Sequence, residues 1–359
     1  MNIRNSKFKV ITLLLIISSI IILNSCGSTD KNQTNAVIDN PASAIIDYLE
    51  ENGNLINSAK VPALINADEV YQNMKGKNYL IIDLRIEESY KEAHIANSVN
   101  VRPVNILHYF ENIIDPNSFE KIVLVCPNSF LSGYVNMTLM LLGYDNVYTL
   151  RYGLSSWNRE AAQNYWLAGV GSYFEGKLDK TEYPKPEMGS LPSIKTDQSS
   201  VYQALRHRVQ EILDVSLKDV VVTTQEILEN PDKYFIICYW PKSTYDEGHL
   251  PGAVHYAPKQ SLARNKDLLT LPTDKPIAVF CYTASHSSFV TAYLRILGYN
   301  AYNQAYGANA FMNNTMIKTQ TTFRGFQDIH INNFPLVSGD ENGEQVEVKT
   351  ETITIQGGC

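Results

Sequence analysis

The feature that most constrains this chain of 359 residues is a pattern that recurs after 155 residues. Shifting the sequence by that distance aligns, without a gap, Tyr90 with Tyr245, His94 with His249, Cys126 with Cys281, Gly143 with Gly298 and Tyr144 with Tyr299. Such a separation is the size of a whole domain rather than the unit of a short-period solenoid. The chain is therefore predicted to hold two copies of one domain, each able to bury its own core.

Each copy centres on a cysteine that lies between an apolar run and an amphipathic pattern. In the second copy, residues 277–280 predict a buried strand, and apolar residues recur at helical spacing through 289–297 until Gly298. Small residues between these segments let the backbone turn tightly around Cys281. Free amide hydrogens and the positive end of a helix dipole would stabilise a thiolate there. This context favours a nucleophile at neutral pH, and a buried structural cysteine is the alternative.

Strand-like and helical patterns alternate, which predicts an α/β fold with a parallel sheet in each copy. Ligands of such sheets bind at the carboxyl ends of the strands, where both cysteine loops fall. The first copy has predicted strands at 79–84, 98–101, 122–125 and 146–150, and predicted helices at 67–73, 87–94, 104–114, 133–142 and 153–157. A helical pattern at 42–51 is expected to pack onto the first domain. A second one, at 199–214, is expected to pack between the domains or onto them.

Changes in composition mark the boundaries of these parts, and a proline-rich segment, YPKPEMGSLP, separates the copies. We expect a signal peptide at 1–25, a lipid-anchored flexible tether at 26–40, the first domain with an N-terminal helix at 41–165, a linker with an amphipathic helix at 166–217, the second domain at 218–318, and a C-terminal extension ending in cysteine at 319–359.

The N-terminal segment predicts export. Three basic residues precede the apolar run 10–23, which is shorter than the roughly 20 residues that a membrane span needs. The run ends in LNSCG, which resembles the lipobox of bacterial lipoproteins and implies cleavage before Cys26 and acylation of that cysteine. We therefore expect a lipoprotein of the bacterial cell envelope, anchored to a membrane through Cys26, with its domains in the periplasm. An ordinary cleavage site beside a cysteine is the alternative.

The overall charge and the cysteine spacing exclude two kinds of site. The formal net charge is −7 and the sequence shows no basic stripe, which argues against a nucleic-acid partner. The five cysteines lack the close spacing of a zinc site, so no metal is expected. Because the count is odd, at least one thiol would remain unpaired in an exported protein.

Several segments together resemble rhodanese (sulfurtransferase) domains. The first copy contains DLRIEESYKEAHIANS, KIVLVCPNSFLSG and LLGYDNVY, and the second contains STYDEGHLPGAV, PIAVFCYTASHSS and ILGYNAY, in the same order. The resemblance implies two rhodanese-like domains, each a central five-stranded parallel sheet flanked by helices. It also implies a cysteine that accepts a sulfane sulfur, forms a persulfide and passes the sulfur to a nucleophile, without a metal or organic cofactor.

The resemblance assigns roles to particular residues. Cys281 is the expected persulfide nucleophile, and Cys126 is a second or vestigial site. The substrate loop would consist of Tyr282, Thr283, Ala284, Ser285, His286 and Ser287. Backbone amides of this loop would hold the negative sulfur. The expected partners are a small sulfane-sulfur donor, such as polysulfide, a persulfide or thiosulfate, and a thiol acceptor.

Both loops depart from the family pattern, which carries an arginine five residues after the cysteine. The corresponding residues are Leu131 and His286, and neither loop contains lysine or arginine. An anionic donor would then meet only backbone amides, and His286 when protonated. We therefore expect weak thiosulfate turnover and favour polysulfide, a small persulfide or a protein thiol as donor.

The first copy is expected to be degenerate or weakly active. Pro127 removes one amide from its loop, and Phe130 and Leu131 make the loop bulky and apolar. The second copy lacks the Asp-x-Arg pair of the first, Asp83 and Arg85, and has Cys238 and Trp240 at those positions. Since the family uses this pair mainly for architecture, its loss need not abolish activity.

For several other residues, a structural role and a functional role are both considered. Cys238 is a resolving thiol or a small buried residue, and Cys359 is a sulfur acceptor on the Gly-Gly-Cys tail or an incidental thiol. His94 and His249 belong to a structural turn rather than to catalysis. Asp83, Arg85 and Glu88 are expected to form a buried or half-buried set of ion pairs that holds the first copy together.

Three other functions compete with sulfur transfer. A catalytically silent module that binds or senses sulfur species, or a protein partner, would explain the altered loops. A phosphatase or arsenate reductase would need an arginine six residues after the cysteine, where this chain has Ser132 and Ser287. Thiol–disulfide exchange would use Cys238 and Cys281.

Overall fold

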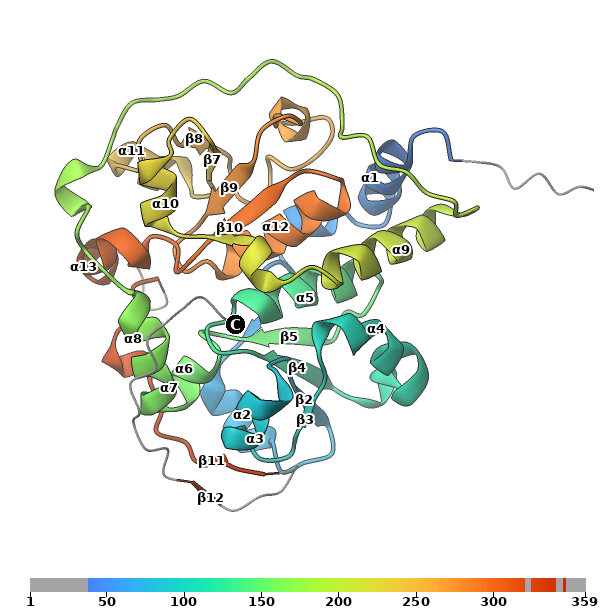
Figure 1. Cartoon of the computed structure of the whole chain (residues 1–359), viewed down its shortest axis with the longest axis vertical. Coiled ribbons are helices and arrows are strands. Elements are labelled where there is room, and N and C mark those ends of the chain that lie inside the picture. The colour runs from blue at the N-terminus through green and yellow to red at the C-terminus, as the bar shows by residue number, and fades with distance from the viewer. Residues whose placement is uncertain (1–37, 320–323, 340–344, 347–359) are drawn as a thin grey trace, which may run out of the picture. The chain divides into compact units, whose positions relative to one another are not determined.

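The computed structural model describes residues 38–319, 324–339 and 345–346, and within them it contains two five-stranded parallel sheets (Figure 1). The strand order is β1-β5-β4-β2-β3 in the first copy and β6-β10-β9-β7-β8 in the second, so both copies have the same topology. The prediction of two α/β domains, each with a five-stranded parallel sheet flanked by helices, is confirmed. The predicted signal peptide, Cys26 and Cys359 lie outside the described residues.

The two copies are built from matching elements. The first contains β1 Leu64–Ile65, α2 Ala67–Asn73, β2 Tyr79–Asp83, α3 Glu87–Glu92, β3 Ser98–Asn100, α4 Ile106–His108, the π-helical turn Tyr109–Ile113, β4 Lys121–Val125, α5 Phe130–Leu141, β5 Val147–Leu150, α6 Leu154–Trp157, α7 Arg159–Asn164 and α8 Trp166–Gly169. The second contains β6 Val221–Val222, α10 Thr224–Glu229, β7 Phe235–Cys238, α11 Lys242–Glu247, β8 Val254–His255, β9 Ile277–Phe280, α12 Ser285–Ile296, β10 Ala301–Gln304 and α13 Asn309–Thr319.

The remaining elements lie before, between, within or after the two copies. They are α1 Pro41–Glu51, α9 Val201–Leu213, the antiparallel pair β11 Leu336–Val337 and β12 Gln345–Val346, and the 3₁₀ turns Leu55–Asn57, Pro103–Asn105, Pro116–Ser118, Glu175–Lys177, Leu217–Asp219, Leu268–Thr270 and Asp328–His330. No helix in the described part of the chain combines the length and the apolar character that a membrane span requires.

The helices that follow the two cysteines start earlier than the sequence predicted. Residues 133 and 289 were the expected starts, whereas α5 begins at Phe130 and α12 at Ser285. The residue before each helix, Ser129 or Ala284, has a positive φ, of 74° and 57° respectively. This left-handed residue turns the chain directly from the loop into the helix, so the cysteine loops are shorter than expected.

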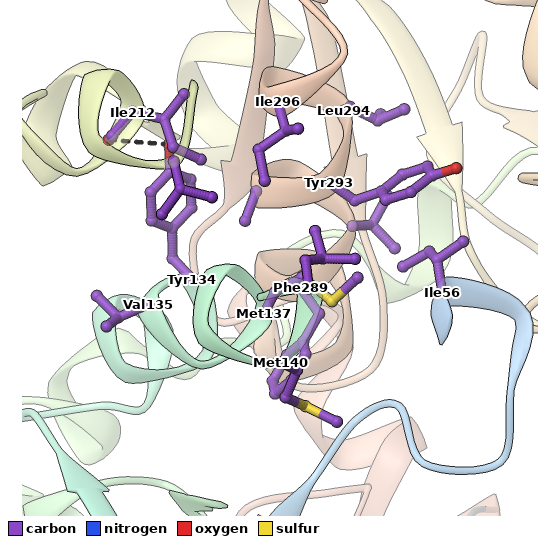
Figure 2. Close-up of a cluster of buried hydrophobic side chains, with 14 of the residues drawn as sticks. Ile56, Tyr134, Val135, Met137, Met140, Ile212, Phe289, Tyr293, Leu294 and Ile296 are labelled. Atoms are coloured by element: carbon purple, nitrogen blue, oxygen red, sulfur yellow. Dashed lines mark hydrogen bonds between the residues drawn. The ribbon is translucent and has the colours of Figure 1, made fainter. Parts of the chain in front are cut away.

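These two helices also form the contact between the copies, where α5 packs against α12 between the sheets (Figure 1). Figure 2 shows the apolar side chains that meet there, with Met137 and Met140 of α5 beside Phe289 of α12. A Cβ atom on Gly133 would lie 2.2 Å from Ser288 Oγ, so glycine permits the close approach. The copies therefore share one continuous apolar core rather than meeting at a polar boundary.

Helix α9 joins the copies, as the sequence predicted. Tyr134 of α5 donates a hydrogen bond to the carbonyl of Ile212 on α9, over 3.3 Å (Figure 2). Arg206 of the same helix pairs with Glu111 of the first copy, and Arg208 donates to the carbonyl of Ile296 in the second. One face of α9 thus contacts both domains.

Helix α1 was expected on the first domain, but its polar contacts reach the second. Arg264, in the second copy, donates its backbone amide to Glu50 and its guanidinium to Asp47 and Ser43. Tyr48 and Leu49 also border the end of α5. The helix therefore bridges both copies, which its amphipathic pattern alone did not reveal.

The segments that follow each copy cross to other parts of the fold. Beyond the first copy, Gly171 and Asp179 hydrogen-bond with Asn309 and His249 of the second. After the second copy, the chain returns to the first, where Trp157 Nε1 donates to the carbonyl of Pro335 over 3.0 Å. This return places the C-terminal extension near both cysteine loops.

Candidate functional site

The Cys281 loop lies between the end of β9 and the start of α12. Sγ of Cys281 lies 3.3 Å from the backbone nitrogen of Ser287 and 3.4 Å from its hydroxyl oxygen. The amide donates a hydrogen bond to the sulfur, and the hydroxyl lies within hydrogen-bond distance of it, at the N-terminal end of a twelve-residue helix. This is the surrounding that the sequence predicted for a stabilised thiolate.

A turn after β10 packs against the backbone of this loop. Gly307 has a φ of +58°, and a Cβ atom added to it would lie 2.3 Å from the carbonyl oxygen of Cys281. The amide of Ala308 donates to the same oxygen over 2.9 Å. Gly153 occupies the same position beneath Cys126. Only glycine allows this close approach at the observed backbone angle.

The Ser287 hydroxyl has a second neighbour that determines where its proton points. Its oxygen lies 2.6 Å from Asn303 Oδ1, and Nδ2 of that asparagine has no partner among the described residues. A hydroxyl has one proton, so it donates either to Asn303 or to Sγ of Cys281. If the amide is turned over, Nδ2 donates to Ser287 and the hydroxyl proton is available to the sulfur.

Cys281 is only 3% exposed, yet it lines a cavity of about 310 Å³. Three cationic residues line the same cavity: Arg151 from the end of β5 in the first copy, Lys259 from the second copy and Arg324 from the C-terminal extension. The sequence analysis expected an anion to meet only backbone amides and His286. That expectation is wrong, because residues distant in sequence supply the positive charge that the loop itself lacks.

His286 also differs from its expected role. Its ring lines the cavity, but its Nε2 atom is buried and has no partner among the described residues. Burial lowers the pKa of His286 to about 3, and the nearby positive charge of Lys259 acts in the same direction. The ring is therefore neutral at pH 7 and does not replace the missing arginine as a cation.

The remaining loop residues shape the wall of the cavity. Tyr282 and Thr283 line it, whereas Ala284 is fully buried behind it. Ser285 Oγ lies 2.9 Å from the hydroxyl of Ser129, which belongs to the cysteine loop of the first copy. The two loops are thus in direct contact, and the first domain supports the loop of the second.

Cys126 has a similar cradle in a more closed environment. Sγ lies 3.4 Å from the amide and 3.3 Å from the hydroxyl of Ser132, the equivalent of Ser287. The side chain is fully buried and does not line the cavity at Cys281. Burial raises the pKa of the Cys126 thiol, although the Ser132 hydrogen bonds act against this. A thiol with a raised pKa that does not line the cavity is a poor nucleophile for a ligand bound there.

Cys238 lies at the end of β7 in a buried apolar cluster with Trp240 and Phe280. Burial, with a smaller contribution from Cys281, raises the pKa of its thiol well above the ordinary value. A neutral buried thiol is a poor nucleophile, so its surroundings favour the structural alternative over a resolving thiol. Cys126, Cys238 and Cys281 are all free thiols.

The Asp83–Arg85 pair is buried as the sequence predicted. Nη2 of Arg85 lies 2.7 Å from Asp83 Oδ2 and also donates to the carbonyl of Ala93. Burial alone would lower the pKa of Arg85, but the Asp83 carboxylate outweighs that effect and raises it. Glu88 is exposed and forms no ion pair with a described residue, so its inclusion in this set was wrong.

The paired histidines have structural surroundings. His94 and His249 are fully buried and stack on Tyr90 and Tyr245, with ring centroids 3.8 Å apart in both cases. This geometry agrees with the predicted structural turn. Among the described residues, no cluster of three or more histidine, cysteine or acidic side chains could hold a metal ion.

Sequence reasoning missed Arg151, Arg324, Lys259 and Asn303. Arg151 and Arg324 lie outside the repeated cysteine motif, and no local pattern marks them as part of a site. Asn303 could have been suspected from the repeat, because the 155-residue shift aligns it with the predicted strand 146–150, and strand ends in parallel sheets border ligand sites.

Comparisons with known proteins agree on one family. The model of the rhodanese-like domain matches residues 66–160 and 203–314, which together make up more than half of the chain. The thiosulfate sulfurtransferase GlpE of Shewanella oneidensis is 26% identical over 98 residues, covering 27% of this chain and 94% of the relative. GlpE of Coxiella burnetii is 32% identical over 90 residues, covering 25% of this chain and 80% of the relative.

Solved structures also resemble parts of the chain. The 3-mercaptopyruvate sulfotransferase SseA of Escherichia coli is 17% identical and covers 68% of this chain and 98% of its own, with a TM-score of 0.23. A thiosulfate sulfurtransferase of Pseudomonas aeruginosa is also 17% identical and covers 73% of this chain and 45% of its own, with a TM-score of 0.28. On the two matches to the family model, the chain belongs to the rhodanese-like domain family.

Proposed function

We propose that this protein transfers sulfane sulfur through a persulfide on Cys281. The observation that carries the proposal is the position of Cys281, which lines a cavity while the Ser287 amide donates to its sulfur and the Ser287 hydroxyl lies 3.4 Å from it. Hydrogen bonds of this kind stabilise a thiolate before attack and a persulfide anion after it.

The proposed reaction has two displacement steps. The Cys281 thiolate attacks the sulfane sulfur of a donor R–S⁻, the R–S bond breaks with its electron pair leaving on R, and a Cys–S–S⁻ persulfide remains. A thiolate acceptor then attacks the outer sulfur, the S–S bond breaks, and the Cys281 thiolate is restored with the acceptor as persulfide. No net electron transfer is required in either step.

The first domain serves mainly as a support in this proposal. Its Cys126 is fully buried, and its loop contacts the second loop through Ser129 and Ser285. The protein is also proposed to be a lipoprotein anchored through Cys26, with its domains in the periplasm. Support for that location comes only from the N-terminal sequence, and fractionation of cells that express a Cys26→Ala variant would check it.

The central experiment measures the intact mass of the protein after incubation with thiosulfate or polysulfide. We expect one added sulfur atom in the wild type and in Cys126→Ser, and none in Cys281→Ser. The added sulfur should be lost when a small thiol is supplied. If Cys281 gains no sulfur from any donor, a silent binding or sensing module becomes the better interpretation. Equal loss in the two variants would contradict the division of labour between the copies.

A further inference from the structure

The cavity at Cys281 contains more positive charge than the cysteine loop can supply. Arg151, Lys259 and Arg324 line it, and none of the described lining residues is acidic. These residues come from the first domain, from the second domain and from the C-terminal extension. A partly open cavity of this size bordered by cations attracts a small anion.

Arg324 is held in a defined position at this cavity. Its guanidinium carbon lies 4.4 Å from the ring centre of Tyr282, and Nη1 donates to the Tyr282 hydroxyl over 3.3 Å. Tyr282 in turn stacks on Trp240, with centroids 5.3 Å apart and an angle of 11° between the planes. This layered arrangement restricts the guanidinium, so less conformational freedom is lost when an anion binds.

Asn309 helps to fix the segment that carries Arg324. Nδ2 of Asn309 donates to the carbonyl of Arg324 over 2.8 Å and to the carbonyl of Tyr282 over 2.6 Å. Its Oδ1 accepts from the amide of Phe326 over 2.7 Å. Asn309 thus ties the C-terminal segment to the loop residue that follows Cys281.

Arg151 approaches the cavity from the first domain. It directly follows β5, and its Nε donates to Asn66 Oδ1 over 2.8 Å. Burial lowers the pKa of Arg151. Arg151 thus brings a cation from the first domain to the wall of the cavity that Cys281 lines.

We propose that Arg324 and Arg151 form the anion-binding site for the sulfur donor at Cys281, in place of an arginine within the loop. This proposal rests on the proposed sulfur transfer and deepens it by naming the residues, from outside the loop, that hold an anionic donor such as thiosulfate at Cys281. For thiosulfate, the Cys281 thiolate attacks the outer sulfur, the S–S bond of the donor breaks, and its electron pair leaves with sulfite. In place of weak thiosulfate turnover, we now expect thiosulfate turnover that depends on these two arginines from outside the loop.

Binding can be separated from chemistry in a Cys281→Ser background. Titration calorimetry with thiosulfate should detect binding, and Arg324→Gln or Arg151→Gln should weaken it by about tenfold or more, since each removes a charge-assisted contact. Arg324→Lys should restore part of the affinity because it retains the charge but not the planar stack. The matched control is Arg159→Gln, because Arg159 pairs with Asp328 of the C-terminal extension but does not line the cavity.

In the protein with Cys281 intact, the Arg324→Gln substitution should raise KM for thiosulfate far more than it lowers kcat. The reaction of Cys281 with an uncharged organic trisulfide, in which an organic thiolate leaves and a mixed trisulfide forms on Cys281, should be unchanged. Thiosulfate affinity that is unaffected by both arginine substitutions, or reduced equally by Arg159→Gln, would overturn the proposal. A protein that binds thiosulfate through these arginines but never gains sulfur on Cys281 would instead refute the proposed function and leave the anion site intact.

Discussion

Removing the Ser287 hydroxyl tests how the fold stabilises sulfur at Cys281. A Ser287→Ala substitution deletes the oxygen that lies 3.4 Å from Sγ and leaves the backbone amide at 3.3 Å in place. The side chain is buried and small, so the change leaves little empty space. The main expected loss is one hydrogen bond to a negatively charged sulfur.

The size of the loss follows from the geometry. A hydrogen bond to a charged group contributes about 1.5–3 kcal/mol, and about 1.4 kcal/mol corresponds to tenfold in rate. The single proton of Ser287 is shared with Asn303, 2.6 Å away, so the lower end of this range applies. We therefore expect sulfur loading of Cys281 at saturating donor to slow by about tenfold in Ser287→Ala.

The assay is a single-turnover experiment in which persulfide on Cys281 is followed by mass spectrometry after rapid quenching. The matched control is Ser132→Ala, which removes the equivalent hydroxyl, 3.3 Å from the sulfur of Cys126. It should leave the rate at Cys281 unchanged. A rate in Ser287→Ala within about twofold of wild type would refute the assigned role of the hydroxyl, and an equal loss in both variants would indicate a general effect on the fold.

Two further outcomes follow from buried charges. Asp83→Asn leaves the buried Arg85 without its carboxylate and should lower the free energy of unfolding by about 3–5 kcal/mol in urea, whereas Glu88→Gln, at an exposed position, should change it by less than about 0.5 kcal/mol. For His286, burial lowers the pKa to about 3. Below the ordinary histidine pKa of about 6.5, the unfolded chain binds a proton at His286 while the folded protein does not. The free energy of unfolding is therefore highest above about pH 6.5 and decreases as the pH falls from there toward 3. The urea midpoint should therefore fall less on acidification in His286→Gln than in wild type, and parallel pH curves would contradict this.

The sequence was sufficient to predict the repeated architecture and the local form of each cysteine loop. The shift of 155 residues placed Cys126 and Cys281 in equivalent positions, and the apolar run, small residues and helical spacing predicted strand, turn and helix. These features are local, because the spacing of apolar residues and the size of loop residues determine the conformation of short stretches of the chain. The buried Asp83–Arg85 pair was likewise predictable from two residues at the end of one strand.

Predictions were weaker wherever a property depends on what packs against a residue. His286 was considered as a loop cation, but burial keeps its ring neutral. Helix α1 was assigned to the first domain from its position in the chain, yet Arg264 of the second domain holds it. The spacing of apolar residues along the chain predicts neither how deeply a loop side chain is buried nor which domain a helix face packs against.

The sequence by itself determined two α/β domains with a cysteine at the carboxyl end of a central strand in each. Only the tertiary structure decided which cysteine faces a cavity and what charge surrounds it. Arg151 lies more than a hundred residues before Cys281, and it reaches the cavity because the copies pack through α5 and α12. Arg324 lies beyond the second domain, and it reaches the cavity because the C-terminal extension folds back. Electrostatic fields act through space, so the charge of a site follows the final packing rather than the order of residues along the chain.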